Sequence, residues 1–176
     1  MIFTETKLAG AFVVAPEKLE DIRGFFAQTW SEREFAEHGI QTRLVEANTS
    51  FNRRKGTLRG MHFQTAPHAQ AKLVRCTAGA IYDVIIDLRP SSRTFKQWVG
   101  VELTAASHLM LYVPEGFAHG FQTLLDATEV FYQVSDIYAP EYAGGVRWND
   151  PAFDIRWPEG ERIIIPRDEQ YPDFNL

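Results

Sequence analysis

Short stretches rich in β-branched and aromatic residues recur along this chain about every ten residues, separated by Gly, Pro, Asn or Asp. Such spacing, with turn signals between the stretches, is typical of an all-β sandwich or barrel. Two packed antiparallel sheets of the jelly-roll type are the architecture that this pattern predicts. The predicted strands are 11–15, 24–30, 43–51, 57–63, 71–77, 80–88, 97–103, 109–113, 117–123, 128–135 and 161–165.

Only one segment has a clear helical signature, and it spans residues 31–39. Ser31 is expected to be the N-cap, and Glu34 three residues later completes a capping box. Gly39 is then expected to end the helix as a C-cap residue. Because no repeat, low-complexity tract or linker divides the sequence, we expect a single domain over residues 1–176.

Several predicted strands are apolar at both parities, and residues 81–88 are the clearest example. A strand with one solvated face alternates polar and apolar residues, so these strands must bury both faces. One face would lie against the core and the other against another sheet or a second subunit. A homodimer would account for the surplus apolar surface.

Composition excludes several other classes of protein. The chain of 176 residues is long enough to bury a large core without disulfides, and its single cysteine, Cys76, allows no intramolecular one. The formal charge is −5 and the basic residues are scattered, which argues against binding of nucleic acid or an anionic membrane surface. No apolar run approaches the roughly 18 residues of a membrane span, and the first residues lack a secretory signal. We therefore expect a cytoplasmic globular protein.

The densest group of candidate catalytic residues lies in 56–64, with Lys72 on the next predicted strand. Arg59 offers a planar cation for phosphate, Lys72 a compact cation for a developing oxyanion, and His62 a base that works near neutral pH. The group suits an anionic substrate and a proton transfer, although polar residues at strand ends would look the same. Arg59 and His62 fall on opposite faces of an ideal strand, so a shared pocket requires a bulge at Gly60.

Two further stretches each contain a candidate site residue. His119 follows a Pro/Gly turn and is flanked by aromatic residues and glycines, as in many ligand pockets. A histidine satisfied within the core is the competing interpretation. Tyr132 shares its strand face with Val130 and Val134, so it is expected to point inward and is a possible general acid. A core tyrosine bonded to a neighbour is the alternative there.

Jelly-roll proteins often bind a metal, so the sequence is compared with their usual ligand pattern. That pattern has His-x-His followed by Glu in one motif and Pro-x-Gly-x-x-His in the other. Residues 114–119 supply the second motif, but His62 is followed by Phe63-Gln64, and the first glutamate after His62 is Glu102. Two histidines without a carboxylate are a poor ligand set for iron, manganese or zinc. We therefore expect no metal.

A series of motifs runs along nearly the whole chain: Asp21-x-Arg23-Gly24-x-Phe26, Leu58-Arg59-Gly60-Met61-His62-Phe63-Gln64, Gln70-Ala71-Lys72-Leu73-Val74-Arg75, Asp83-Val84-x-x-Asp87-Leu88-Arg89, Pro114-x-Gly116-Phe117-Ala118-His119-Gly120-Phe121, Tyr138-Ala139-Pro140-Glu141, Arg147-Trp148-Asn149-Asp150-Pro151, Trp157-Pro158 and Arg167-Asp168. With these motifs in this order, the sequence resembles the dTDP-4-dehydrorhamnose 3,5-epimerase family, the RmlC-like cupins of nucleotide-sugar metabolism. The resemblance implies a double-stranded β-helix, the cupin jelly roll, with a few short helices. It also implies a reaction without a cofactor and a homodimer in which an N-terminal segment crosses to the partner.

By this resemblance, His62 removes a proton next to the C4 ketone of a dTDP-linked 4-keto-6-deoxy sugar. Asp168 would pair with His62 and fix its tautomer, and Lys72 would stabilise the enolate oxygen. Tyr132 would return a proton to the opposite face, which inverts the carbon. Epimerisation at both C3 and C5 would convert dTDP-4-dehydro-6-deoxyglucose to dTDP-4-dehydrorhamnose. The residues implied in substrate binding are Arg23, Phe26, Gln28, Glu46, Asn48, Arg59, His119, Tyr138 and Arg167.

Three positions depart from the common family pattern. Gln28 and Ala143 stand where glutamate is common, and Glu46 stands where glutamine is common. Because Gln28 and Glu46 lie near the base and sugar in the family, a purine or cytosine nucleotide stays open. A single epimerisation at C3 or C5 of a different 4-keto sugar is equally open. Two other classes compete: a metal-dependent cupin enzyme, and a sugar-binding cupin that has no need of a paired base and acid.

Overall fold

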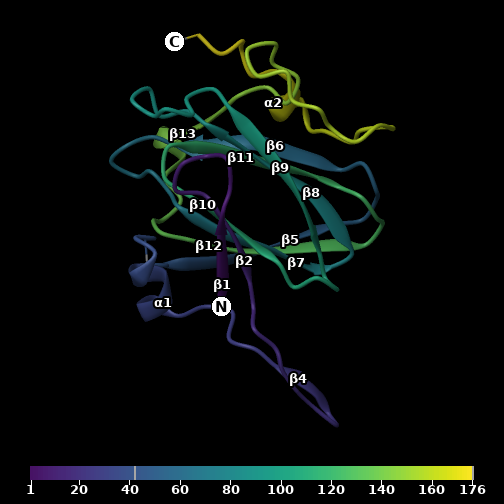
Figure 1. Ribbon diagram of the computed structural model, residues 1–176. Coiled ribbons are helices and arrows are strands. Elements are labelled where there is room, and N and C mark those ends of the chain that lie inside the picture. Colours follow the sequence, from purple (N-terminus) through teal and green to yellow (C-terminus); the bar gives the residue numbers. More distant parts are fainter. Residues whose placement is uncertain (42, 176) are drawn as a thin grey trace.

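Two antiparallel sheets face each other in this computed structural model, which describes residues 1–41 and 43–175 (Figure 1). In the order in which they pair, the strands of the six-stranded sheet are β1 (Ile2–Glu5), β2 (Phe12–Ala15), β10 (Met110–Val113), β7 (Lys72–Ala78), β12 (Thr128–Val134) and β5 (Glu46–Asn52). Those of the five-stranded sheet are β13 (Ala143–Gly145), β6 (Leu58–Gln64), β11 (Phe117–Thr123), β8 (Ala80–Asp87) and β9 (Trp98–Thr104). The predicted double-stranded β-helix is confirmed.

The predicted strands are observed, with ends shifted by up to three residues, except at two places. Of residues 24–30, only β4 (Gly24–Phe26) is a strand, because its one partner, β3 (Leu19–Asp21), is equally short. Residues 161–165 form no strand. Ile163 makes a single parallel bridge with Thr57, and the chain turns into a helix at Pro166, which has no N–H for a ladder. The short strands β1, β3 and β13 were not predicted, since each is defined by its partner rather than by its own composition.

The helices are short, and only one was predicted. Helix α1 (Glu32–Glu37) begins after Ser31, whose side chain accepts a hydrogen bond from the Glu34 N–H at 3.4 Å. Gly39 follows the helix with φ +67°, which confirms the predicted cap. The others are η1 (Pro140–Tyr142) and α2 (Pro166–Glu169). Among the described residues, no helix is long and apolar enough to cross a membrane.

Strand β8 buries both of its faces, as its sequence predicted. Ile81 and Ile85 belong to the core between the two sheets, whereas Val84 and Ile86 pack on the outer side of the five-stranded sheet. That outer side is covered by the chain's own C-terminal segment, residues 146–175 (Figure 1). The buried residues that this segment contributes are Val146, Phe153 and Trp157.

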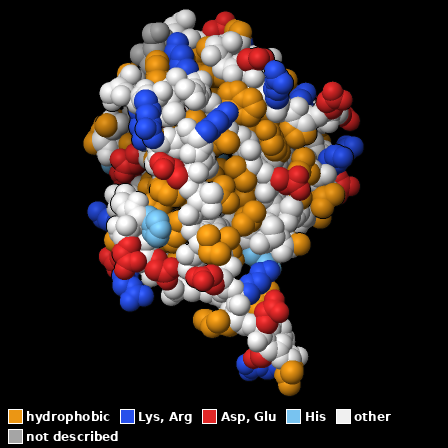
Figure 2. Space-filling view, in the orientation of Figure 1, with side chains coloured by type: hydrophobic (Ala, Val, Ile, Leu, Met, Phe, Trp, Pro, Cys, Tyr) orange, Lys and Arg blue, Asp and Glu red, His pale blue; other side chains and the backbone are white. Residues whose placement is uncertain are grey.

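The β3–β4 hairpin projects from the body of the molecule and belongs to neither large sheet (Figures 1 and 2). Several of its apolar side chains are exposed, including Leu19, Ile22 and Phe26. Apolar side chains gathered on a thin projection are typical of a surface that contacts another molecule. The hairpin is therefore the part of the fold that the isolated chain leaves unpacked.

Candidate active site

A cavity of about 410 Å³ opens between the two sheets, and a smaller cavity of about 150 Å³ adjoins it. Both are lined by His62, Lys72, Tyr132 and Arg167, so they are parts of one site. These four side chains come from β6, β7, β12 and α2, which are far apart in the sequence. The jelly roll therefore gathers the predicted catalytic histidine, lysine and tyrosine in one place.

Arg59 and His62 reach the same cavity because β6 has a bulge at Gly60. His62 pairs with His119 of β11, and Arg59 pairs with Phe121. The two pairs are three residues apart along β6 but only two residues apart along β11, so β6 contains one extra residue. Gly60 has φ +145°, and a Cβ there would lie 2.5 Å from the Cα of the facing strand's Gly120. Only glycine fits such a conformation and such a close approach. The predicted bulge is confirmed.

Helix α2 brings Asp168 against His62. The His62 Nε2 lies 2.9 Å from Asp168 Oδ1, and the Gly60 N–H donates to Oδ2 at 3.1 Å. Burial opposes ionisation of Asp168, but hydrogen bonds from His62, Gly60 and Arg167 outweigh it and lower the pKa of the carboxyl group. An ionised Asp168 accepts the Nε2 hydrogen, which leaves the free lone pair of the imidazole on Nδ1.

Lys72 is a buried cation beside this histidine. Its Nζ donates to the backbone carbonyl of His62 at 3.4 Å, and only 9% of the residue is exposed. Burial lowers the pKa of the Lys72 ammonium to about 8, although the charge of Asp83 acts in the opposite direction. Lys72 is therefore mostly protonated at neutral pH, in surroundings where a positive charge acts strongly on a nearby oxyanion.

Tyr132 lies on the sheet opposite to His62. Its ring shares the inward face of β12 with Val130 and Val134, as predicted, and the residue pairs with Asn48 of β5. Burial raises the pKa of the Tyr132 phenol, so the hydroxyl stays protonated at neutral pH. A hydrogen-bond acceptor on one sheet and a proton donor on the other thus line a single cavity.

His119 lines the same cavity, but one of its ring nitrogens has a partner. Its Nε2 lies 2.7 Å from Oδ1 of Asp83, and both side chains are buried. Burial lowers the pKa of His119 despite this carboxylate. No role for Asp83 was predicted from the sequence. The available signal was an aspartate at an inward-facing position of β8, between Ile81 and Ile85.

Arg59 is held in place at the edge of the cavity. Its Nε donates to Asn52 Oδ1 at 2.8 Å, and the guanidinium lines the larger cavity. Glu46 and Asn48 lie on β5 at the same parity as Ser50, whose side chain lines that cavity. Glu46 and Asn48 themselves are not among the described residues that line either of the two cavities.

The smaller cavity is lined by aromatic side chains that extend the site outward. Tyr138 is 60% exposed and faces it together with Arg167, whose Nε donates to Asp168 Oδ1 at 3.3 Å. Tyr171 also lines it, with its ring centroid 6.3 Å from that of His62. Tyr171 was not predicted, and only its closeness in sequence to Asp168 hinted at it.

Known proteins of similar sequence identify the family of this chain. The sequence model of the family described as dTDP-4-dehydrorhamnose 3,5-epimerase matches residues 5–175. The dTDP-4-dehydrorhamnose 3,5-epimerase of Sinorhizobium fredii is 42% identical over 175 residues, which are 99% of this chain and 90% of that protein. The chain belongs to the dTDP-4-dehydrorhamnose 3,5-epimerase family. The resemblance deduced from its motifs is confirmed.

Solved structures of this family have the same fold. The dTDP-4-dehydrorhamnose 3,5-epimerase of Elizabethkingia anophelis superposes with a TM-score of 0.96 at 38% identity, covering 99% of this chain and 96% of that one. The Bacillus anthracis enzyme, solved with TDP and PPi bound, gives 0.94 at 42% identity, with coverages of 98% and 99%. ChmJ, a 3'-monoepimerase from Streptomyces bikiniensis, gives 0.88 at 31% identity, with coverages of 96% and 85%.

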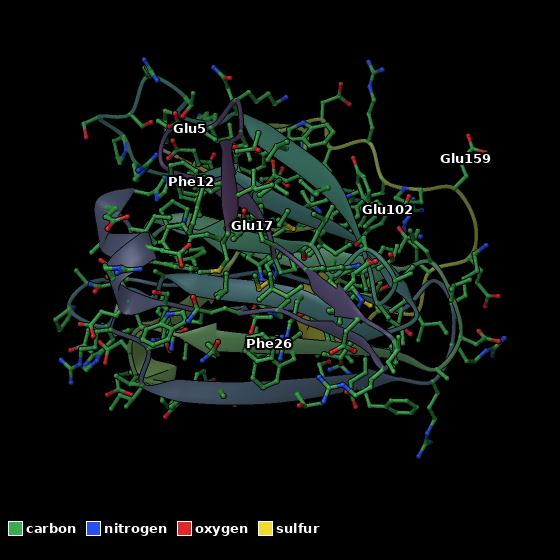
Figure 3. The ribbon with its side chains drawn as sticks, turned by 60° about the horizontal axis from the view of Figure 1, so that its bottom comes forward. Glu5, Phe12, Glu17, Phe26, Glu102 and Glu159 are labelled. Carbon is green, nitrogen blue, oxygen red and sulfur yellow. The ribbon has the colours of Figure 1, made fainter. Side chains whose placement is uncertain are left out.

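In this member of the family, three predicted binding residues lie away from the cavity. Arg23 is at the hairpin tip with its side chain 85% exposed and paired with Asp21. Phe26, labelled in Figure 3, and Gln28 line a separate cavity of about 380 Å³ beside Met1. One chain alone therefore does not bring Arg23, Phe26 and Gln28 to His62.

The two histidines of the cavity face each other in register on β6 and β11. Each has an aspartate at hydrogen-bonding distance, Asp168 for His62 and Asp83 for His119. Across residues 1–41 and 43–175, no group of three or more His, Cys, Asp or Glu side chains could hold a metal ion. The absence of a metal stays a prediction from the sequence.

Proposed function

We propose that this protein epimerises a dTDP-linked 4-keto-6-deoxy sugar at C3 and C5. The observation that carries the proposal is the position of His62 and Tyr132 on opposite sheets, facing one cavity, with Lys72 beside the histidine. Inversion of a carbon requires a base on one side of the sugar ring and an acid on the other. A sugar lying between the two sheets meets both.

In the proposed reaction, His62 takes a proton from the carbon next to the C4 ketone, and the electron pair moves onto the ketone oxygen. The Lys72 ammonium stabilises the enolate, because a fixed cation in a poorly solvated cavity acts where the charge develops. The Tyr132 hydroxyl then gives its proton to the opposite face of that carbon. Exchange with solvent returns a proton to the phenolate and removes one from the imidazolium.

The cations around the cavity suit the diphosphate of the substrate. Arg59 and Arg167 offer planar, permanently charged groups at its rim, the kind of group that pairs with phosphate oxygens in two places. Asn48 and Glu46 on the neighbouring strand would face the nucleotide, and Tyr138 offers an exposed ring for stacking on the base. The TDP bound to the Bacillus anthracis relative supports this class of ligand.

A homodimer would complete this site. Arg23, Phe26 and Gln28 lie on or next to a projecting hairpin that exposes several apolar side chains, Leu19, Ile22 and Phe26 among them. In a twofold dimer, the hairpin of each chain would extend to the cavity of the other. The three residues would then contact the nucleotide bound by the partner.

The experiment is proton NMR of dTDP-4-dehydro-6-deoxyglucose incubated with the protein in heavy water. Deuterium at both C3 and C5, with formation of dTDP-4-dehydrorhamnose, is the expected result. Exchange at one carbon alone would replace the proposal with a single-site epimerase, the class to which ChmJ belongs by its description. Absence of exchange would overturn the proposed substrate and direct attention to the base and sugar contacts of Gln28 and Glu46.

A further inference from the structure

Asp83 is a buried carboxylate, and one of its two oxygens lacks a hydrogen-bond partner within the described residues. It lies on the inward face of β8, fully buried, and its Oδ1 accepts a hydrogen bond from His119 at 2.7 Å. Its Oδ2 is also buried and has no hydrogen-bond partner within the described residues. A carboxylate taken out of water is destabilised unless an opposite charge acts on it.

Lys72 is a buried cation that lines the same cavity as His119, the hydrogen-bond partner of Asp83, and its own burial is also unfavourable. Its ammonium has three hydrogens, and the one hydrogen bond that it makes within the described chain is the long one to the His62 carbonyl. The two groups form no direct ion pair, since the salt bridge of Asp83 is with His119. The carboxylate therefore acts on the ammonium through the interior, while the ammonium hydrogens stay available to a ligand.

Other charged and titratable groups surround this pair. Those that face the same space from the packed elements are Arg59, His62, His119, Tyr132 and Arg167. The positive charges of Arg59 and Arg167 oppose protonation of Lys72. Cys76, which lies within the field of Asp83, is kept as a thiol by burial, which raises its pKa to about 11. Asp83 is thus the group whose charge favours the protonated form of Lys72.

We infer that Asp83 is a positioning residue that keeps Lys72 in its ammonium form and so sets the alkaline limit of the reaction. This inference rests on the proposed function, in which Lys72 stabilises the enolate oxygen. A neutral amine has no charge to offer that oxygen. A direct Asp–Lys contact would occupy the ammonium hydrogens, so a carboxylate that is bonded to His119 and makes no ion pair with Lys72 leaves those hydrogens available to the substrate.

The test compares the pH profiles of kcat/KM for the wild type and D83N, which removes the charge and keeps an oxygen for the His119 bond. The Lys72 pKa of about 8 predicts an alkaline limb near that pH. In D83N we expect the limb about one pH unit lower, because a nearby opposite charge shifts a pKa by about that much. Activity would then fall about eightfold relative to wild type at about pH 8.5, and less than about 1.5-fold at about pH 6.5.

D87N is the matched control. Asp87 is also fully buried on the inward parity of β8, but its partners are Arg89, Ser92 and Thr94. D87N should leave the alkaline limb in place when assayed below its unfolding temperature. In K72R the arginine stays charged, so adding D83N should no longer move the limb.

A readout independent of turnover separates this inference from the proposed function. In protein labelled with 13C-lysine, the Cε signal missing from K72R identifies Lys72, and its pH midpoint is measured in wild type and D83N. A midpoint about one unit lower in D83N supports the inference. An unchanged midpoint overturns it, whether or not the protein is active. If the Lys72 midpoint shifts in D83N but the alkaline limb of kcat/KM does not move, the charge of Lys72 does not control the rate. That result would overturn the role of Lys72 in catalysis and the control of turnover by Asp83.

Discussion

Burial shifts the pKa of three groups that line the larger cavity. It lowers the pKa of Lys72 to about 8, lowers that of His119 and raises that of Tyr132. The pKa of Asp168 shifts against its burial, since three hydrogen-bond donors outweigh the burial and lower that pKa. The result at neutral pH is a cation and a neutral phenol beside a histidine that a carboxylate orients, an arrangement suited to proton transfer at carbon.

The first prediction concerns the base. His62→Ala should reduce deuterium exchange into the sugar by about 10²- to 10⁴-fold, the usual effect of losing a general base. Binding of dTDP, measured by calorimetry, should change little, because the proposed phosphate contacts come from arginines. Turnover close to the wild-type rate would remove His62 as the base.

The second prediction concerns the acid. Tyr132→Phe deletes the hydroxyl and leaves the ring that packs against the core, so the variant should fold normally. It should impair formation of the inverted product more than the entry of deuterium at the attacked carbon, since abstraction precedes the step that uses the phenol. Both rates are read from one series of NMR spectra. Equal losses in the two rates would contradict the role of Tyr132 as the acid of the opposite face.

Among the elements, β6 does most to assemble the site, and it does so through an irregularity. A regular strand would send Arg59 and His62 to opposite faces. The bulge at Gly60 brings both to the cavity, and the Gly60 N–H holds the carboxylate that orients His62. Helix α2 is only four residues long, yet it supplies that carboxylate from the far end of the chain.

The third prediction follows from this bulge. Gly60→Ala should destabilise the protein by about 2–4 kcal/mol and abolish activity, because the new Cβ would lie 2.5 Å from Gly120 Cα. Urea unfolding and the exchange assay measure the two effects. Gly160→Ala is the control: Gly160 has φ +120° but no atom within 4 Å of an added Cβ. It should lose about 1 kcal/mol from backbone strain alone and stay active. Similar losses in both variants would contradict the close-packing argument.

At the scale of the whole molecule, the chain buries one set of apolar surfaces and leaves another uncovered. The C-terminal segment covers the outer side of the five-stranded sheet. The hairpin remains a projection with exposed Leu19, Ile22 and Phe26 (Figure 2). A monomer would expose these side chains to water, and this exposure is the observation behind the proposed homodimer.

The fourth prediction tests that assembly. Each single variant should be nearly inactive alone, because Arg23→Ala lacks a substrate-binding group and His62→Ala lacks the base. If the hairpin serves the partner's cavity, one site of each mixed dimer is intact. Equal mixing after co-expression or subunit exchange should then restore about a quarter of the wild-type activity. If each hairpin served its own cavity, no mixed dimer would contain an intact site and the mixture would stay inactive.

Prediction from the sequence succeeded best where local chemistry decides structure. The cap of α1 needs only Ser31 and Gly39, and the core strands need only their β-branched runs. It failed where pairing with another strand determines the structure. Strand β13 has the sequence Ala-Gly-Gly and is a strand because it pairs with β6. The stretch around Ile163 has strong β-propensity but forms one bridge before Pro166 begins a helix.

The sequence by itself determined the fold class, the family and the identity of the histidine, lysine and tyrosine of the cavity, because these are properties of local pattern and ordered motifs. Only the tertiary structure decided which groups act on one another. Asp168 lies 106 residues after His62 in the chain and meets it at 2.9 Å, and the outer face of β8 is covered by residues 146–175. Electrostatic interaction and burial depend on distance in space and on exclusion of water, and neither can be read from separation along the chain.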